Sequence, residues 1–354
     1  MGETNLKRWL LPEKGTFYKA NLHTHTSVSD GKYPPEEVKR RYKEKGYSIL
    51  AFTDHDVFVP HPELNEPDFL ALHGHEAEIG ENVVLGTRYQ KTYHLNFYAK
   101  DPKATLSPVF SETRVRNANA KTHVTDEMRK TDAYAYYSVD SINDLIRRAN
   151  ENGFFVTYNH PVWSLQTYSE YSGLKGLWGI EVFNYGCVIL ELPDTTIPFD
   201  DLLRCGKDVF PICADDTHLK VDDCFGGWTM IKAESLSYEK VIDALMRGDF
   251  YSSTGPEIRE LTLEDGILNV RCAAPADLIV VSDWRANVPK RYHAERDGED
   301  WSCSIPLSPF SKKYVDQSQH GWQDSYFRIE VVGADGKRAY TRAFRFRDFP
   351  ELYV

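Results

Sequence analysis

Cysteine is scarce in this sequence. Six cysteines occur among 354 residues, and no two of them form a Cys-x-x-Cys pair. Scattered cysteines in a chain of this length predict reduced thiols and not a disulfide framework. Long apolar runs are also missing: no run approaches the roughly 18 residues that a membrane span needs, and residues 1–15 lack the apolar core of a signal peptide. We therefore expect a cytoplasmic protein with no membrane partner.

Positive charge is in deficit as well. Lysine and arginine total 42 against 53 acidic residues, and the formal net charge is −11 at pH 7. A protein that binds nucleic acid without regard to sequence needs a basic surface, so extended nucleic acid is disfavoured as a partner. A small anionic substrate stays open, because bound metal cations would reverse the local charge.

Histidine, by contrast, occurs in a pattern. His23 and His25 follow an apolar residue, and Asp30 comes five positions after the second histidine. Side chains alternate along an extended segment, so the two imidazoles project from one face and can bind one metal ion. The alternative is a strand end whose histidines face solvent or bond to a backbone carbonyl.

Most of the chain alternates between helix and strand signals. Start and stop residues predict helices over 35–45, from Asp140 or Ser141 to Asn150, over 199–204 and over 238–247. Between them lie the apolar runs 47–52, 69–72, 93–99, 154–158, 177–184 and 209–214. A polar stretch over 100–130 is expected to be a long loop. Alternating strands and helices indicate a parallel sheet, and about seven strands in this span indicate a (β/α) barrel.

Ligand-type residues follow these apolar runs, at the strand ends where such barrels keep their active sites. The candidate metal ligands are His23, His25, Asp30, His55, Glu76, His94, His160, Asp216 and His218. Nine nitrogen and oxygen ligands would serve two or three cations. No cysteine lies beside them, which favours a catalytic cluster of Zn, Mn or Fe over a structural thiolate site. We expect five other histidines to lie at the surface, namely His61, His73, His123, His293 and His320.

The pattern changes near residue 257. Alternating strand segments flank Asp265-Gly266 and again Asp335-Gly336, two hairpin signals, and no helix pattern appears in this part. We therefore predict two domains: 1–256 as the barrel and 257–354 as a small all-β, sandwich-like domain.

The ordered motifs resemble a known family. L-H-x-H-T-x-x-S-D-G, T-D-H, G-x-E, a lone histidine, N-H-P and D-x-H occur in the order typical of the PHP (polymerase and histidinol phosphatase) domain. The resemblance covers about residues 17–256. It implies a distorted seven-stranded (β/α) barrel, a centre of two or three metal ions, and phosphatase or phosphodiesterase activity. Residues 248–256 and the β domain resemble the branch with carbaryl-hydrolase-like members.

The resemblance also implies how the ligands divide. His23 and His25 would hold one ion with Glu76 and Asp216. Glu76 would bridge to a second ion on His94 and His160, and Asp30, His55 and His218 would complete either a third position or the remaining shell of the first two ions. The motif spacing favours Glu76 over Glu78 and Asp216 over Asp215. Asp54 is expected to orient His55, and Glu181 to lie in the core or to support the ligands.

The expected function is hydrolysis of a small phosphate ester or nucleotide by a metal-bridging hydroxide, with His160 or His218 protonating the leaving oxygen. Two alternatives stay open: a hydrolase of carboxylic esters, amides or carbamates on the same site, and a non-catalytic binding module. Homo-oligomerisation is also open. Four basic residues lie in or near loops that could reach the site, namely Arg88, Lys91, Arg114 and Arg116. For each of them, an exposed and solvated side chain is the simpler interpretation.

Overall fold

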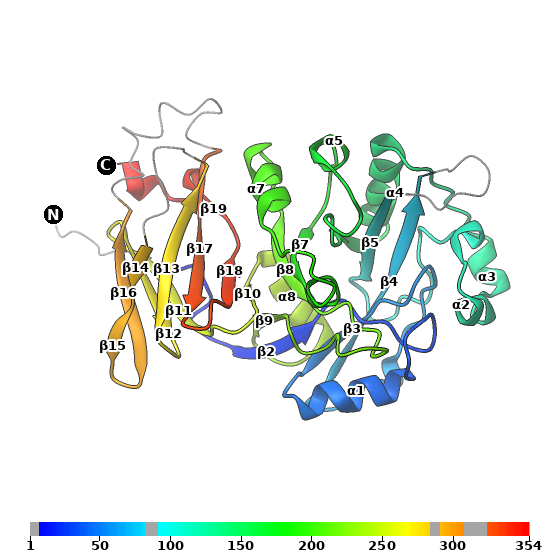
Figure 1. The fold of residues 1–354 in the computed structure, drawn as a ribbon, viewed down its shortest axis with the longest axis horizontal. Coiled ribbons are helices and arrows are strands. Elements are labelled where there is room, and N and C mark those ends of the chain that lie inside the picture. Colours follow the sequence, from blue (N-terminus) through cyan, green and yellow to red (C-terminus); the bar gives the residue numbers. More distant parts are fainter. Residues whose placement is uncertain (1–6, 82–90, 284–290, 308–323, 354) are drawn as a thin grey trace.

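A single long sheet carries the candidate ligands and continues into the C-terminal region (Figure 1). The computed structural model describes residues 7–81, 91–283, 291–307 and 324–353. Within them the sheet has 14 strands, in the order β14-β13-β17-β18-β10-β9-β2-β3-β4-β5-β6-β7-β8, with β19 paired to β17. Its strands before residue 257 are β2 (Thr16–Asn21), β3 (Ile49–Phe52), β4 (Leu70–Gly80), β5 (Thr92–Ala99), β6 (Phe154–Tyr158), β7 (Gly179–Asn184), β8 (Phe210–Ala214), β9 (Trp228–Ala233) and β10 (Phe250–Ser253).

The direction of the strands differs from the all-parallel expectation. The pairs β2–β3, β3–β4, β6–β7 and β7–β8 are parallel, but β5 runs antiparallel to both of its neighbours, β4 and β6. β4 extends for 11 residues, well past the predicted run, and most of its length pairs antiparallel with β5. The sequence analysis also missed β9, which lies antiparallel to β2 and β10.

A closed barrel is not confirmed. Among the described residues β8 forms a ladder with β7. The segment that follows β8 meets the segment that follows β2 through one isolated bridge, between Thr24 and Thr217. Two backbone hydrogen bonds flank this bridge: Asp216 N–H donates to the His23 carbonyl, and His25 N–H donates to the Thr217 carbonyl. The part of the sheet from β2 to β8 therefore curls until the segment after β8 touches the segment after β2, at the level of the candidate ligands.

The principal helices follow the predicted start and stop signals. They are α1 (Pro35–Glu44), α4 (Val139–Glu151), α7 (Ile197–Arg204) and α8 (Tyr238–Arg247). Gly248 ends α8 in the left-handed conformation, with φ of 74°. The cap of α4 is Ser138, which accepts from Ser141 N–H, and not Asp140 or Ser141 as predicted. None of the helices in the described ranges is long and apolar enough to cross a membrane.

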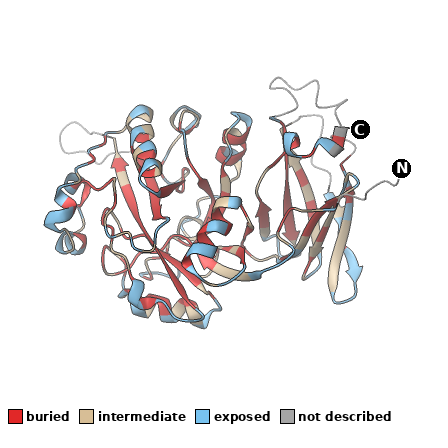
Figure 2. Ribbon diagram, turned by 180° about the vertical axis from the view of Figure 1, so that it is seen from behind, coloured by how far each residue is buried: buried red, intermediate tan, exposed pale blue. Residues whose placement is uncertain are grey.

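The 100–130 segment is not a plain loop. It contains η2 (Glu112–Arg114), α2 (Ala118–Thr122) and α3 (Asp126–Arg129), because Asn117 and Thr125 accept backbone N–H groups at the two helix starts. Further short helices are η1 (Pro62–Leu64), α5 (Tyr168–Tyr171) and α6 (Tyr185–Val188). Between residues 49 and 253 the strands are mostly buried, and exposed residues gather on the outer faces of the helices (Figure 2).

The C-terminal region is all-β, as expected, apart from the single turns η4 (Phe346–Asp348) and η5 (Pro350–Tyr353). A second sheet has the order β1-β11-β12-β16-β15 and shares a hydrophobic core with the far end of the long sheet. Asp265 and Gly266 join β11 to β12 with φ of 49° and 73°, the pattern of a tight hairpin. The strands are β1 (Lys7–Trp9), β11 (Ile258–Glu264), β12 (Ile267–Cys272), β13 (Ala276–Ser282), β14 (Arg291–His293), β15 (Glu295–Asp297), β16 (Asp300–Pro306), β17 (Tyr326–Gly333), β18 (Arg338–Thr341) and β19 (Phe344–Arg345).

A buried ion pair joins this β region to α7. The Arg328 side chain on β17 is 1% exposed, and its Nε and Nη2 donate to Asp200 Oδ1 and Oδ2 at 2.8 and 2.7 Å. Arg328 Nη1 donates to Glu330 Oε1 at 2.6 Å. A buried guanidinium that loses its carboxylate keeps the cost of desolvation without the compensating attraction.

We expect Asp200→Asn to lower the free energy of unfolding by about 3 kcal/mol, because it removes the bidentate carboxylate and leaves buried Arg328 only Glu330, which Arg338 also uses. Urea unfolding followed by fluorescence measures the loss. The matched control is Asp144→Asn on α4, whose partner Arg147 is exposed, and which should cost about 0.5 kcal/mol or less. An equal loss of unfolding free energy in the two variants would contradict a larger contribution of the buried Arg328 pair to stability.

Candidate metal centre

The predicted ligands converge at one end of the curled sheet. His23 and His25 follow β2, His55 follows β3, and Asp30 lies in the turn before α1. Glu76 and His94 lie within β4 and β5, His160 follows β6, and Asp216 and His218 follow β8. All nine belong to groups of side chains whose nitrogen and oxygen atoms lie within 4.8 Å of one another.

Glu76 stands at the middle of this cluster. The residue is 1% exposed, and its two carboxylate oxygens face five imidazoles. The nitrogen–oxygen distances are 3.3 Å to His23, 3.4 Å to His25, 3.3 Å to His55, 3.0 Å to His94 and 3.3 Å to His160. One further donor is Asn159, whose Nδ2 donates to Glu76 Oε1 at 2.8 Å.

Two other carboxylates flank Glu76. Asp216 Oδ1 lies 3.2 Å from His23 Nε2 and 3.0 Å from His25 Nε2, and its Oδ2 lies 3.6 Å from His160 Nε2. On the outer side, Asp30 Oδ2 lies 3.4 Å from His218 Nε2. Asp30 Oδ1 is 3.9 Å from both His25 and His55, so these four residues form a more open group.

Glu181 supports the cluster from behind. This buried residue on β7 accepts from His23 Nδ1 at 2.7 Å, and its other oxygen accepts from His160 N–H at 3.0 Å. A proton on Nδ1 leaves the Nε2 lone pair of His23 facing Glu76 and Asp216, the orientation that metal binding needs. Asn184 donates to both Glu181 and Asp216, at 2.9 and 3.2 Å.

The neighbouring aspartates have other tasks. Asp215 turns away from the histidines and accepts from Tyr42 Oη and from the backbone N–H groups of 225–227. Asp54 does not orient His55, contrary to expectation. Its carboxylate accepts from the backbone N–H and hydroxyl groups of Thr26 and Ser29 and so fixes that turn.

Two candidate ligands have left-handed backbone. φ is 26° at His160 and 55° at Asp216, a region that residues with a Cβ seldom adopt. Such conformations persist only where the surroundings enforce them, and they cluster at functional sites. Here the Glu181 bond to His160 N–H and the bond from Asp216 N–H to the His23 carbonyl hold them.

The electrostatics of the cluster are those of closely packed opposite charges. Burial lowers the pKa of His25 and His94, but the facing carboxylates outweigh burial and raise both pKa values to about 10. Burial raises the pKa of Asp216, yet His23 and His25 hold it well below its usual range. Burial and the cationic His25 lower the pKa of His55 to about 3. A metal ligand must be a neutral imidazole, so cations would enter this site by displacing protons.

The cluster fits divalent metal ions. Ligand atoms about 2.1 Å from one ion lie roughly 3.0–3.4 Å apart, the spacing found around Glu76 and Asp216. Six cluster atoms are also buried without a hydrogen-bond partner among the described residues: His25 Nδ1, His55 Nδ1, both ring nitrogens of His94, Glu76 Oε2 and Asp216 Oδ1. Buried polar atoms of this kind need a partner, and histidine with carboxylate is a donor set suited to Zn, Mn or Fe.

Several other expectations need correction. His61 and His73 are buried, not at the surface, because they pack against Phe52 and Tyr238. His293 is exposed as expected, His123 is partly buried, and His320 lies outside the described residues.

The four cations named from the sequence also lie in different settings. Arg114 is buried and donates to the Ala133 carbonyl, and Lys91 is paired with Glu170 at 2.5 Å. Arg116 approaches Glu78 at 4.0 Å, while Arg88 is outside the described residues. The sequence reasoning did not single out Asn159, Asn184 or Lys220, although the first two stand in the same strand-end positions that identified the histidines.

Comparison with known proteins identifies the first half of the chain. Residues 21–189 match the family model of the PHP domain, so this segment is a PHP domain. The match contains seven of the nine candidates; Asp216 and His218 lie beyond it. No curated protein matches the chain.

Three solved structures are similar to this chain. One is a two-domain protein with a predicted PHP-like metal-dependent phosphoesterase from Bacteroides vulgatus, at TM-score 0.42 and 15% identity, covering 95% of this chain and 98% of that one. A second, named as a candidate metal-dependent phosphoesterase of Bifidobacterium adolescentis, has a TM-score of 0.36 and 18% sequence identity. The match covers 59% of this chain and 89% of that one. The third is an amidohydrolase from Chromobacterium violaceum with bound sulfate and no metal, at a TM-score of 0.38 and 17% sequence identity. The match covers 56% of this chain and 87% of that one. At TM-scores below 0.5 these likenesses say nothing about the reaction.

Glu181→Gln tests the support of His23. We expect it to weaken metal binding by about 10- to 100-fold, because an amide can present its N–H to His23 and so favour the wrong tautomer. Competition with a chromogenic chelator measures the affinity, and circular dichroism checks the fold. Glu63→Gln, on an exposed carboxylate beside His61, serves as the control. Unchanged affinity in Glu181→Gln would contradict the assigned role.

Proposed function

We propose that this protein is a metal-dependent phosphoesterase that hydrolyses a small phosphate ester or nucleotide. The observation that carries the proposal is the buried carboxylate of Glu76, which faces five histidines within the segment that matches the PHP domain. Two or three divalent ions held there, of Zn, Mn or Fe, would activate water at neutral pH and neutralise the phosphate oxygens.

The geometry supports a division of the ligands. His23, His25, Glu76 and Asp216 form one group, and His55 and His94 form a second group with Glu76. His160 Nε2 reaches both Glu76 and Asp216. Asp30, His55 and His218 complete the outer group with His25. Glu76 is thus the residue placed to serve more than one ion.

His218 is the better candidate for the proton donor to the leaving group. Its side chain is 23% exposed, and its Nδ1 donates to the Asp216 carbonyl at 3.0 Å, so the outward Nε2 faces Asp30 and the opening. The His160 side chain is 4% exposed and lies between two carboxylates, which suits a ligand better than an acid that meets substrate.

We also retain, as proposals, the division of the chain at residue 256, the distorted (β/α)7 barrel and a cytoplasmic location. The curled sheet with its single bridge at Thr24 supports the barrel. β1 pairs with β11, so residues 7–9 pack with the β region. All six cysteines are free, which fits a reducing compartment.

Hydrolysis resolved by metal and substrate tests the function. The protein is stripped, reloaded with Mn, Zn or Fe, and assayed on a phosphate monoester, a phosphodiester and a carboxylic ester. We expect metal-dependent turnover of a phosphate ester and at least about a 100-fold loss of kcat/KM in His25→Ala, which removes a ligand shared by two groups.

The control variant is His293→Ala, on an exposed histidine of β14. Turnover of the carboxylic ester alone would replace phosphoester hydrolysis with carbonyl hydrolysis. Metal binding without turnover of any ester would contradict the proposal and favour a binding module.

A further inference from the structure

An open groove lies beside α1, next to the outer edge of the candidate metal centre. It has about 940 Å³ of open space between α1, the turn that precedes it and the segment 219–225. Its charged lining residues are Lys32, Arg40, Arg41, Lys45 and Lys220, against Glu44 and Asp222. The groove therefore has an excess of three positive charges in a protein whose net charge is −11.

Two of these cations have no carboxylate partner. Arg40 and Arg41 are tied to Glu37 on the same helix. The exposed Lys32 and Lys45 instead lie against aromatic rings, with Nζ 5.1 Å from the centre of the Tyr33 ring and 5.7 Å from that of Phe225. Within the described part of the chain neither ammonium forms an ion pair. Uncompensated like charges in one groove repel one another unless an anion joins them.

Lys220 connects the groove to the metal centre. Its Nζ lies 3.1 Å from Asp30 Oδ2, the same oxygen that faces His218 Nε2. The segment that carries it is fixed by Asp223, which accepts from Thr217 Oγ1 and from the N–H groups of His218 and Leu219.

The other wall of the groove is joined to the same segment. Lys32 N–H donates to the His218 carbonyl at 2.8 Å. The backbone that positions Asp30 and His218 therefore also positions cations on both walls of the groove.

We infer that this groove is a second anion site for the substrate of the metal centre. The substrate would carry, beyond the reacting phosphate, a further phosphate or carboxylate that lies between Lys32, Lys45 and Lys220. This inference rests on the proposed function. A positive groove at the edge of an acidic protein attracts such an anion and fixes its orientation, so these lysines act as specificity-determining residues.

Matched substrates test the inference on the metal-loaded protein. Alkyl phosphates of increasing chain length are compared as pairs that end in a methyl group or in a carboxylate. We expect kcat/KM to favour the carboxylate-ended member by about tenfold at the best chain length, and the preference to fall severalfold in Lys45→Met and in Lys32→Met. Lys45→Arg, which keeps the positive charge, should retain the preference for the carboxylate-ended substrate. The control Lys121→Met, on α2 and away from the groove, should keep the wild-type ratio.

A binding measurement separates this inference from the proposed reaction. Non-hydrolysable phosphonates with the same two endings are titrated calorimetrically into the metal-loaded wild type and Lys45→Met. Tighter binding of the carboxylate-ended phosphonate, lost in the variant and at high salt, supports the groove even if no ester turns over.

Turnover of phosphate esters with equal kcat/KM for both endings would overturn the inference and leave the phosphoesterase standing. Equal binding of both phosphonates in wild type and variant would overturn it as well.

Discussion

The burial of Glu76 is the constraint on which the rest of the site depends. A carboxylate that is 1% exposed and faces five imidazoles cannot be left without compensating charge. Protonated histidines supply that charge in the absence of metal, as the raised pKa values of His25 and His94 indicate. Divalent cations satisfy the same carboxylate while leaving each imidazole neutral. The cluster is thus built so that protons and metal ions compete for one set of atoms.

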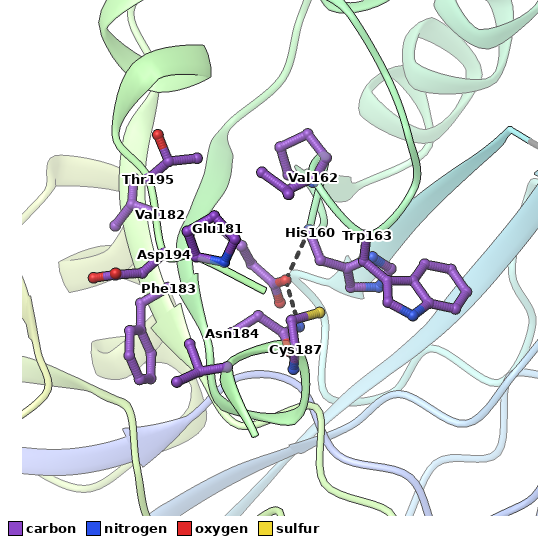
Figure 3. Close-up of a pocket in the computed structure, with 13 residues that line it drawn as sticks. His160, Val162, Trp163, Glu181, Val182, Phe183, Asn184, Cys187, Asp194 and Thr195 are labelled. Carbon is purple, nitrogen blue, oxygen red and sulfur yellow. Dashed lines mark hydrogen bonds between the residues drawn. The ribbon is translucent and has the colours of Figure 1, made fainter. Parts of the chain in front are cut away.

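The fold supplies this cluster with a rigid frame. The isolated bridge between Thr24 and Thr217 joins the segments that follow β2 and β8, and Asp54 and Asp215 fix the adjacent turns through backbone N–H groups. The C-terminal β region stabilises the frame from outside. Arg328 and Tyr340 donate to residues of 194–200, the segment between the strands that carry Glu181 and Asp216 (Figure 3 shows part of this segment beside His160). These contacts join the β region to the segment between β7 and β8.

Much of the site could be predicted because ligand-type residues recur at strand ends, and parallel strands bring such ends together. All nine candidates lie in the cluster, and the ends of parallel strands explain those that follow β2, β3, β6 and β8. The role of Asp54 could not be read from its place beside His55, since it depends on the contacts that its carboxylate makes with the turn at 26–29. The strand over 93–99 was predicted, but its antiparallel direction was not, because an apolar run has no direction. The closed barrel remains unconfirmed because closure depends on long-range pairing between β8 and the segment after β2.

Crystals of the protein loaded with manganese would test the central claim most directly. Anomalous scattering locates each ion independently of any assumed reaction. The account predicts at least two ions, both within bonding distance of Glu76, with His23 and His25 on one and His94 on the other. Ions bound elsewhere, or a cluster that stays proton-filled at saturating manganese while the fold is intact, would contradict it.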